Sequence, residues 1–308
     1  MKRIRVIFIA SFPRSGSTLL ERLLAELGSV AVVGEGRRVW ERGFANNELC
    51  SCGHHFCDCP FWSDVREVAR RSGAIDPAET RVLGEEAIPD RPGLASMRRS
   101  KRIDPRRLTA YKRELSILYA SIAHVSGRST IVDSSKDMSY GSLLGTLPGV
   151  DMTLVHLVRD PRAVAYSWQR KRRRPEITDR VEYMPTISPA GTAVGWMRRN
   201  IAIELASRRS TGPHRVRYED LVANSLTVVP RLLGGADNNP SELVGNPSGV
   251  PLGSYHSASG NPMRLDRGPL KVAADSEWEL KMKMRDRALI LALAFPGILR
   301  YGYLRSAT

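Results

Sequence analysis

The chain has 308 residues, of which 42% are hydrophobic and 6% aromatic, and its 47 Lys and Arg against 32 Asp and Glu give a net charge of +15. This length is enough for one large domain with its own core, and the charge favours anionic partners such as nucleotides, nucleic acids or acidic substrates. Few aromatic residues are present for base stacking, which disfavours a binder of single-stranded nucleic acid.

The predicted elements alternate between strands and helices. The first strand, 3–10, is rich in Val and Ile, as buried parallel strands are, and leucines at helical spacing follow at 18–27. Further strands are predicted at 30–33, 130–133, 153–158 and 216–218, and further helices at 108–124, from 160 onward, and at 196–208, 221–233 and 277–294. This alternation predicts an α/β fold, with a parallel sheet flanked by helices.

Several stretches set the expected organisation. No linker-like change in composition is found, so residues 1–308 are predicted to form a single domain with a Cys-rich insertion at about 45–62. The apolar run 289–299 is expected to be a buried helix, and 238–260, rich in Gly, Pro, Asn and Ser, a loop. No apolar run is long enough to span a bilayer and no secretory signal is visible, so a cytoplasmic location is expected.

A phosphate-binding loop is predicted between the first strand and the first helix. Residues 11–18 read Ser-Phe-Pro-Arg-Ser-Gly-Ser-Thr, which compares with the G-x-x-x-x-G-K-[ST] loop of ATP-binding proteins. Gly16 and Thr18 match, but Ser11 replaces the first glycine and Ser17 replaces the lysine that reaches the β- and γ-phosphates of ATP. Backbone N–H groups and Arg14 are therefore expected to hold a phosphate, whereas kinase chemistry is disfavoured.

A second basic turn follows the strand at 153–158. It reads Arg159-Asp160-Pro161-Arg162, and Ser167 lies two helical turns further on. Ligands of open α/β sheets bind at the carboxyl ends of the strands, so Arg159 is expected to face the same site as the first loop. Arg162 is expected to pair with a carboxylate.

Together the two segments resemble the nucleotide-binding motifs of sulfotransferases that use 3′-phosphoadenosine 5′-phosphosulfate (PAPS). The resemblance extends from Ile7 to about Trp278. It implies a P-loop nucleotide-hydrolase-like fold and transfer of a sulfuryl group from PAPS to a hydroxyl of a carbohydrate or other small molecule. It also implies that Arg159 and Ser167 bind the 3′-phosphate. The 5′-phosphosulfate is expected at Pro13, Arg14, Ser15, Gly16, Ser17 and Thr18.

Two later segments fit the same resemblance. Residues 214–221 are similar to the family's segment near the adenine, so Tyr218 is expected either to contact the base or to be a core tyrosine. Residues 259–264 resemble the loop that closes over the nucleotide. This similarity implies contacts from Gly260, Asn261 and Arg264, the last with the 3′-phosphate, although a solvated arginine is the alternative.

Sulfuryl transfer needs a base for the acceptor hydroxyl and positive charge for the leaving phosphate, and side chains can supply both, so no catalytic metal is expected. Glu35 lies in a segment similar to the catalytic segment of tyrosylprotein sulfotransferases and is the candidate base, with His156 as the alternative. The resemblance assigns Lys136 to the leaving oxygen and Arg14 to the phosphosulfate. The candidate substrate-binding residues are Arg37 and Asp133, although Asp133 is equally consistent with a helix cap.

Four cysteines lie within ten residues, at positions 50, 52, 57 and 59, with His54 and His55 between them. The C-x-C-x₄-C-x-C spacing is not a standard zinc knuckle, so a structural zinc, a local disulfide and reduced thiols all remain open for Cys50, Cys52, Cys57 and Cys59. Bacterial sulfotransferases often carry a similar segment, which implies that it shapes the acceptor side of the site rather than taking part in catalysis.

Two other functions fit part of the pattern. A nucleotide or small-molecule kinase would explain the loop but not the missing lysine, and a nucleic-acid-binding protein would explain the charge and the basic run 170–174. No nucleic-acid partner is expected, because such a run is more often a solvated helix end. Residues 63–105 and 172–190 match no familiar motif and are expected to carry acceptor specificity. The acceptor itself and the oligomeric state remain open.

Overall fold

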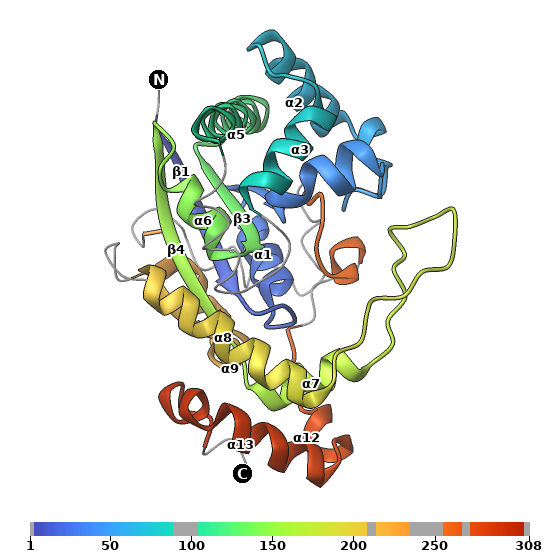
Figure 1. The fold of residues 1–308 in the computed structure, drawn as a ribbon, viewed down its shortest axis with the longest axis vertical. Helices are drawn as coiled ribbons and strands as arrows, with labels where there is room; N and C mark the ends of the chain where they lie inside the picture. Colours follow the sequence, from blue (N-terminus) through green and yellow to red (C-terminus); the bar gives the residue numbers. More distant parts are fainter. Residues whose placement is uncertain (1–2, 89–103, 208–213, 235–254, 267–271, 305–308) are drawn as a thin grey trace.

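The computed structural model describes residues 3–88, 104–207, 214–234, 255–266 and 272–304 (Figure 1). Its centre is a five-stranded sheet in the order β2-β3-β1-β4-β5, and every strand pair is parallel. The strands are β1 (Ile4–Ser11), β2 (Ala31–Gly34), β3 (Thr130–Lys136), β4 (Val150–Val158) and β5 (His214–Arg217). The predicted fold class, a parallel sheet flanked by helices, is confirmed.

Alternating side chains of the central strand β1 enter two different cores. Val6, Phe8 and Ala10 pack into a cluster with residues of α5 and α6, whereas Ile7 and Ile9 pack with residues of α1 and α10. The helices named here are α1 (Ser17–Glu26), α5 (Pro105–Ser126), α6 (Met138–Leu144) and α10 (Ser225–Leu232). Because β1 is buried on both faces, its sequence is a continuous apolar run rather than an alternating one.

The remaining helices extend the two sides of the sheet. Between β2 and α5, a π-helix (Val39–Ala45) precedes α2 (Pro60–Arg71) and α3 (Pro77–Ala87), and these helices pack on the β1–α5 side. At the opposite end lies a layer with its own core, made of α7 (Pro161–Gln169), α8 (Pro189–Ser207), α12 (Glu277–Lys281) and α13 (Met284–Arg300). Residues 170–188 project from the body of the molecule between α7 and α8 (Figure 1). A short helix, α9 (Tyr218–Ala223), follows β5.

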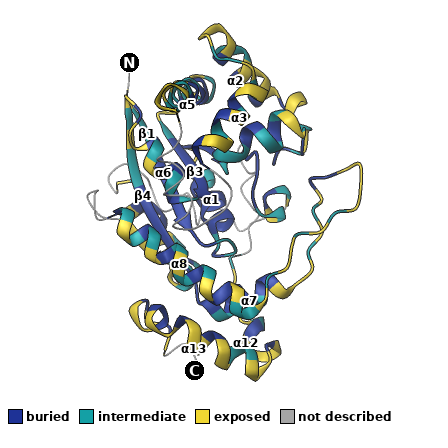
Figure 2. Ribbon diagram, in the orientation of Figure 1, coloured by how far each residue is buried: buried dark blue, intermediate teal, exposed yellow. Residues whose placement is uncertain are grey.

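Two predictions for the C-terminal region need correction. The predicted helix 277–294 is two helices, since Met282 and Lys283 have extended backbone between α12 and α13. The apolar run 289–299 is not a buried helix: Ile290, Ala294 and Ile298 are buried, but the leucines between them are exposed on the other side of α13 (Figure 2). One face of a helix suffices for packing. For the predicted loop 238–260, residues 238–254 lie outside the described residues.

No helix within the described ranges combines the length and the apolar character that crossing a membrane requires.

Candidate active site

The loop between β1 and α1 is shaped to receive an anion. Gly16 caps α1 with φ 95° and offers no side chain to the helix N-terminus, so the first backbone N–H groups of α1 are not capped by a side chain. Arg14 also has a positive φ of 73°. The hydroxyls of Ser11 and Ser15 are buried and have no hydrogen-bond partner among the described residues. Unpaired buried donors beside a helix N-terminus fit a phosphate or phosphosulfate group.

Tyr218 packs directly on this loop. A Cβ atom at Gly16 would overlap the Tyr218 ring, so only glycine fits this position. The ring also contacts the Arg159 guanidinium, whose central carbon lies 4.2 Å from the ring centre. Tyr218 is thus placed between the phosphate loop and Arg159, and its contact with the adenine base stays a prediction.

Arg159 connects the two predicted phosphate motifs. Its Nη1 donates to the backbone oxygen of Arg14 at 3.1 Å, and its Nη2 pairs with Asp275 at 2.9 Å. The guanidinium is buried, and its Nε has no hydrogen-bond partner among the described residues. One free donor and one exchangeable carboxylate partner suit a residue that receives a phosphate.

Ser167 and Arg162 lie on α7, directly after Arg159. Ser167 is buried in the second helical turn. Arg162 forms an ion pair with Asp160 at 2.6 Å, as the sequence predicted, and Asp160 also caps α7 by accepting from the Arg162 N–H. The Arg162 guanidinium is therefore bound to Asp160, the residue that caps α7.

The side chain of Arg14 turns away from the loop that carries it. Its Nη2 lies 2.7 Å from the Met184 sulfur, and its guanidinium lies 5.2 Å from the Trp168 ring centre. Burial, together with the nearby charge of Arg172, lowers the pKa of Arg14 to about 10, so it stays cationic at neutral pH. Arg14 Nη1 is buried without a partner among the described residues, which leaves a donor for an incoming anion.

Glu35 and Lys136 meet where β2 and β3 end. Lys136 is the last residue of β3, and its positive φ of 66° turns the side chain across to Glu35, with Nζ 2.6 Å from Oε1. Both residues line one cavity beside the loop between β1 and α1. The lining residues are Pro13, Glu35, Arg37, Arg38, Ser135, Lys136, Asp137 and Arg199.

Charge around Glu35 decides its protonation state. Burial alone would raise the pKa of this carboxyl, but the ammonium of Lys136 and the guanidinium of Arg42 outweigh burial and lower the pKa to about 2. Glu35 is therefore a carboxylate at neutral pH and, while Lys136 stays paired with it, a weak base.

Asp137 and Arg199 also line this cavity. No sequence motif indicated either residue. Asp137 pairs with Arg37 at 3.4 Å and with Arg199 at 3.2 Å. Arg37 also donates to the Ile88 oxygen, at 2.6 Å. Burial opposes ionisation of Asp137, but Arg199 and Arg37 lower its pKa. The position of Arg199 on α8, far along the chain, gave no local sequence signal.

Asp133 does not line this cavity. Its carboxylate is fully buried, accepts from the Tyr119 hydroxyl, and accepts from the Ser135 N–H at 2.7 Å. The residue that caps α6 is Asp137, not Asp133. These contacts hold the turn that presents Lys136, so they support a positioning role better than contact with the acceptor.

His156, the alternative base, lies in the interior of β4. It is fully buried, its Nε2 lies 2.8 Å from Asn200 Oδ1, and its ring packs edge-on against Tyr301. Burial lowers the pKa of His156. It is not among the residues lining the Lys136 cavity, so the geometry favours Glu35.

The segment 255–264 lies over the phosphate loop. The Asn261 N–H donates to Thr18 Oγ1 at 3.3 Å, and the Glu35 N–H donates to the Ser259 oxygen at 3.1 Å. Gly260, with φ 153°, lies beside Thr18. Arg264 is buried, and its Nη1 donates to the oxygens of Leu49 and Ser257. Arg264 thus ties this segment to the Cys-rich region, and its contact with a 3′-phosphate stays a prediction.

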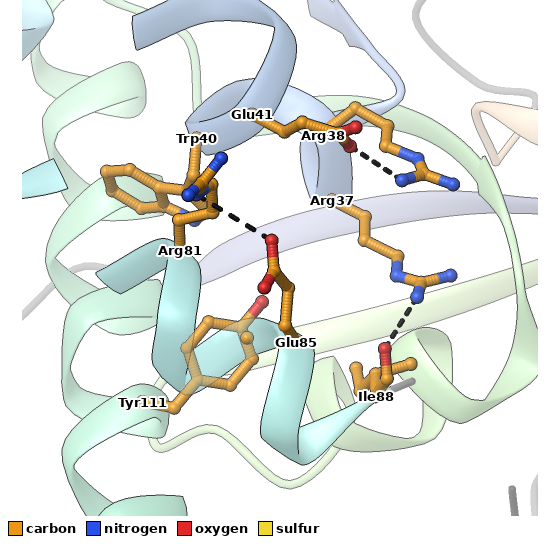
Figure 3. A pocket seen from close by; sticks show the side chains of 9 residues that line it. Arg37, Arg38, Trp40, Glu41, Arg81, Glu85, Ile88 and Tyr111 are labelled. Carbon is orange, nitrogen blue, oxygen red and sulfur yellow. Dashed lines mark hydrogen bonds and ion pairs between the residues drawn. The ribbon is translucent and has the colours of Figure 1, made fainter. Parts of the chain in front are cut away.

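A second cavity adjoins the first and shares Arg37 and Arg38 with it (Figure 3). It lies between the π-helix, α3 and α5. The lining residues are Arg37, Arg38, Trp40, Glu41, Arg81, Gly84, Glu85, Ile88 and Tyr111. Its mixture of cationic, aromatic and carboxylate side chains suits a polar organic molecule.

A P-loop-like α/β sheet, a loop at a helix N-terminus that lacks the ATP lysine, and a Lys–Glu pair at the strand ends are consistent with a transferase. Residues 6–237 match the profile described as the sulfotransferase family, and the chain belongs to this family.

One solved structure supports the fold. The sulfotransferase domain of the olefin synthase of Synechococcus PCC 7002 is 20% identical, with a TM-score of 0.51 and 96% of each chain covered. The sulfotransferase domain from the curacin biosynthetic pathway is 17% identical, with a TM-score of 0.49, 96% of this chain and 99% of that one being covered. No match was found among curated protein sequences.

Proposed function

We propose that the protein transfers the sulfuryl group of PAPS to a hydroxyl of a carbohydrate or other small molecule, and that residues 1–308 act as one sulfotransferase domain. The observation that carries this proposal is the Lys136–Glu35 pair beside the loop between β1 and α1. It combines a cation for the leaving phosphate with a carboxylate for the acceptor proton. The unpaired hydroxyls of Ser11 and Ser15 fit the 5′-phosphosulfate, and Arg159 fits the 3′-phosphate.

The reaction is an in-line displacement at sulfur. The acceptor oxygen forms a bond to sulfur while the bond from sulfur to the 5′-phosphate oxygen breaks, and the acceptor proton passes to Glu35. Negative charge grows on the departing phosphate oxygen, where Lys136 donates a hydrogen bond that strengthens as the bond breaks. Adenosine 3′,5′-bisphosphate is the product that leaves.

The ion pair makes the proton affinity of Glu35 depend on whether the donor is bound. In the pair, Lys136 holds the pKa of Glu35 at about 2. The donor's phosphosulfate offers Lys136 a second anion, and movement of the ammonium toward it removes the largest charge that stabilises the Glu35 carboxylate. The proton affinity of Glu35 then rises when a base is needed.

The acceptor is proposed to enter through the cavity of Figure 3. This cavity shares the lining residues Arg37 and Arg38 with the Lys136 cavity, and Trp40, Arg81 and Tyr111 also line it. Aromatic faces and paired charges together suit a hydroxyl-rich molecule.

Thermal stabilisation tests the donor. Adenosine 3′,5′-bisphosphate at 100 times its dissociation constant adds about 2.7 kcal/mol to the free energy of unfolding, and we expect ATP and duplex DNA to add far less at equal concentration. Equal stabilisation by ATP would favour a kinase.

Incubation with sulfur-labelled PAPS and a cell extract, followed by mass analysis of the labelled product, identifies the acceptor. Absence of any labelled product despite bisphosphate binding would contradict transferase activity.

A further inference from the structure

Three cysteines and a distant histidine converge on one point outside the active-site cavity. The ligand atoms of Cys50, Cys52, Cys59 and His256 all lie within 4.8 Å of one another. Cys59 Sγ lies 3.5 Å from Cys52 Sγ and 3.2 Å from His256 Nδ1, and Cys50 Sγ lies 3.9 Å from the same nitrogen. The histidine follows Cys59 by 197 positions, so no local motif brings it there.

We propose that Cys50, Cys52, Cys59 and His256 bind one zinc ion in a closed, structural site. Three thiolates and one imidazole are a set of four that structural zinc sites use. With Zn–S near 2.3 Å and Zn–N near 2.0 Å, tetrahedral geometry requires S···S of about 3.8 Å and S···N of about 3.5 Å. The three separations given above lie within a few tenths of an ångström of these values, and the other three pairs of ligand atoms lie within 4.8 Å.

The surroundings hold the ligands in place. The His256 ring stacks on Phe61, with ring centres 4.7 Å apart and an angle of 11° between the planes, and the His256 backbone oxygen accepts from Trp62 Nε1 at 3.0 Å. The Cys50 N–H donates to the His54 oxygen, which closes the turn that presents the first two cysteines. Such supporting contacts orient metal ligands and fix the ring of a ligating histidine.

Cys57 is not part of the site. It is exposed, and its backbone N–H is held by the Asn47 side chain. A disulfide would join only two of the three clustered thiols. It would leave the third thiol and His256 outside the bond. The convergence of four ligand atoms, rather than two, therefore points to an ion.

The site fastens the segment above the nucleotide loop to the Cys-rich region. From His256 the chain runs to Ala258, whose N–H donates to the Val33 oxygen, and to Ser259, whose oxygen accepts from the Glu35 N–H. Asn261 then contacts Thr18. His256 is thus three residues from Ser259, whose oxygen positions the backbone of Glu35. Zinc at His256 would therefore support the position of Glu35 without touching the substrate.

Zinc content of the full chain, purified without metal-affinity resin, tests the proposal by elemental analysis. We expect one zinc per chain in the wild type and in the matched controls Cys57→Ser and His54→Ala, the latter because His54 Nδ1 lies 3.6 Å from Cys52. Cys59→Ser and His256→Ala are expected to lower the affinity for zinc by at least about 100-fold in competition with a coloured chelator. Equal loss from Cys57→Ser and Cys59→Ser, or loss from His54→Ala but not from His256→Ala, would overturn the assignment.

A second measurement does not depend on whether the variants fold. Replacement of the metal by Co²⁺ in the wild-type chain should give thiolate-to-cobalt charge-transfer absorption with the strong ligand-field bands of a tetrahedral site. Chelation should lower the melting temperature by at least about 5 °C, and zinc should restore it. Iron in place of zinc, weak octahedral cobalt bands, or an intact mass showing two clustered thiols oxidised to a disulfide would each refute the proposal.

Discussion

The ammonium of Lys136 lies 2.6 Å from Glu35 Oε1, although the two residues are 101 positions apart in the sequence. Glu35 directly follows β2 and Lys136 ends β3, and these two strands pair side by side, with a register shift between Val32 and Gly34. Each residue therefore sets the electrostatic state of the other, and a substitution of either one is expected to change the behaviour of both.

Substitution of Lys136 by methionine tests the leaving-group assignment. We expect Lys136→Met to lower kcat by about 100-fold or more with little change in KM, because the lost hydrogen bond strengthens only in the transition state. The acid limb of the pH–rate profile should also move to higher pH, since removal of this ammonium raises the pKa of Glu35 from about 2. Lys281→Met, at an exposed lysine paired with Glu277, is the control. Unchanged kcat in a folded Lys136→Met protein would remove Lys136 from the mechanism.

The base is tested by Glu35→Gln. The amide keeps the shape of the side chain but accepts no proton, so turnover should fall by about 100-fold or more while affinity for adenosine 3′,5′-bisphosphate is retained. Glu67→Gln, at a partly exposed residue paired with Arg70 and Arg71 on α2, serves as the control. Single-turnover assays and calorimetric titration separate the two quantities. Near-normal turnover in Glu35→Gln would show that another group, or water, takes the proton.

Arg159→Ala distinguishes the two phosphates. Loss of a charge-assisted contact is expected to cost about 2–3 kcal/mol, equivalent to about 30-fold or more in affinity for the bisphosphate. Adenosine 5′-phosphosulfate lacks the 3′-phosphate and should lose much less, whereas Arg14→Ala should weaken both ligands. The exposed Arg170→Ala is the control. Equal losses for the two ligands in Arg159→Ala would contradict its assignment.

Gly16→Ala and Gly28→Ala form a matched pair for the phosphate loop. Both glycines have positive φ, so both substitutions carry backbone strain of about 1–2 kcal/mol. Only at Gly16 would the new Cβ overlap the Tyr218 ring, since nothing lies within 4 Å at Gly28. We expect Gly16→Ala to abolish measurable nucleotide binding and Gly28→Ala to preserve it, as measured by calorimetry. Similar binding in both variants would argue against tight packing of Tyr218 on the loop.

Glu21 predicts a pH dependence of stability. This carboxyl is fully buried in α1, and burial raises its pKa to about 8, although Lys136 and the Tyr255 hydroxyl oppose the shift. Because the folded pKa exceeds the unfolded value, the stabilising contribution of this group is complete below about pH 4.3 and is lost as pH rises through 8. The free energy of unfolding should fall by up to about 1.4 kcal/mol per pH unit in this window.

Chemical denaturation at several pH values measures this effect. Glu21→Gln removes the titration and should flatten the dependence between pH 5 and 8, with Glu79→Gln, at an exposed residue of α3, as the comparison. A slope that Glu21→Gln leaves unchanged would show that the carboxyl is already ionised in the folded protein at neutral pH.

The strands, and the polar residues that follow them, could be predicted from the sequence because buried parallel strands are continuous apolar runs. The run before Ser11 and the run before Arg159 are of this kind, and a polar turn after each run marks the ligand edge of the sheet. The strand predicted at 130–133 extends to Lys136 in the structure, whereas the role expected of Lys136 came from the family resemblance. The helices α2 and α3 were not predicted; α2 packs mainly on α5, and α3 packs on α5 and on the π-helix.

Residues joined only by tertiary contacts gave no such signal. Arg199 reaches the cavity from the middle of α8, and His256 reaches Cys59 across 197 positions from a loop rich in Gly, Pro and Ser. Nor does the spacing of the cysteines show that Cys57 points to solvent. The exposed leucines of α13 were expected in the core because hydropathy alone does not tell which side of a helix has a neighbour.

The central strand β1 lies between β3, which ends at Lys136, and β4, which is followed by Arg159. Ala10 pairs with Lys136 on one side and with His156, three residues before Arg159, on the other. The strands that present Lys136 and Arg159 are therefore held two strand spacings apart, about 10 Å, by backbone hydrogen bonds. The distance between the groups at these two strand ends is therefore set by the main chain, and substitution of a side chain cannot readily change it.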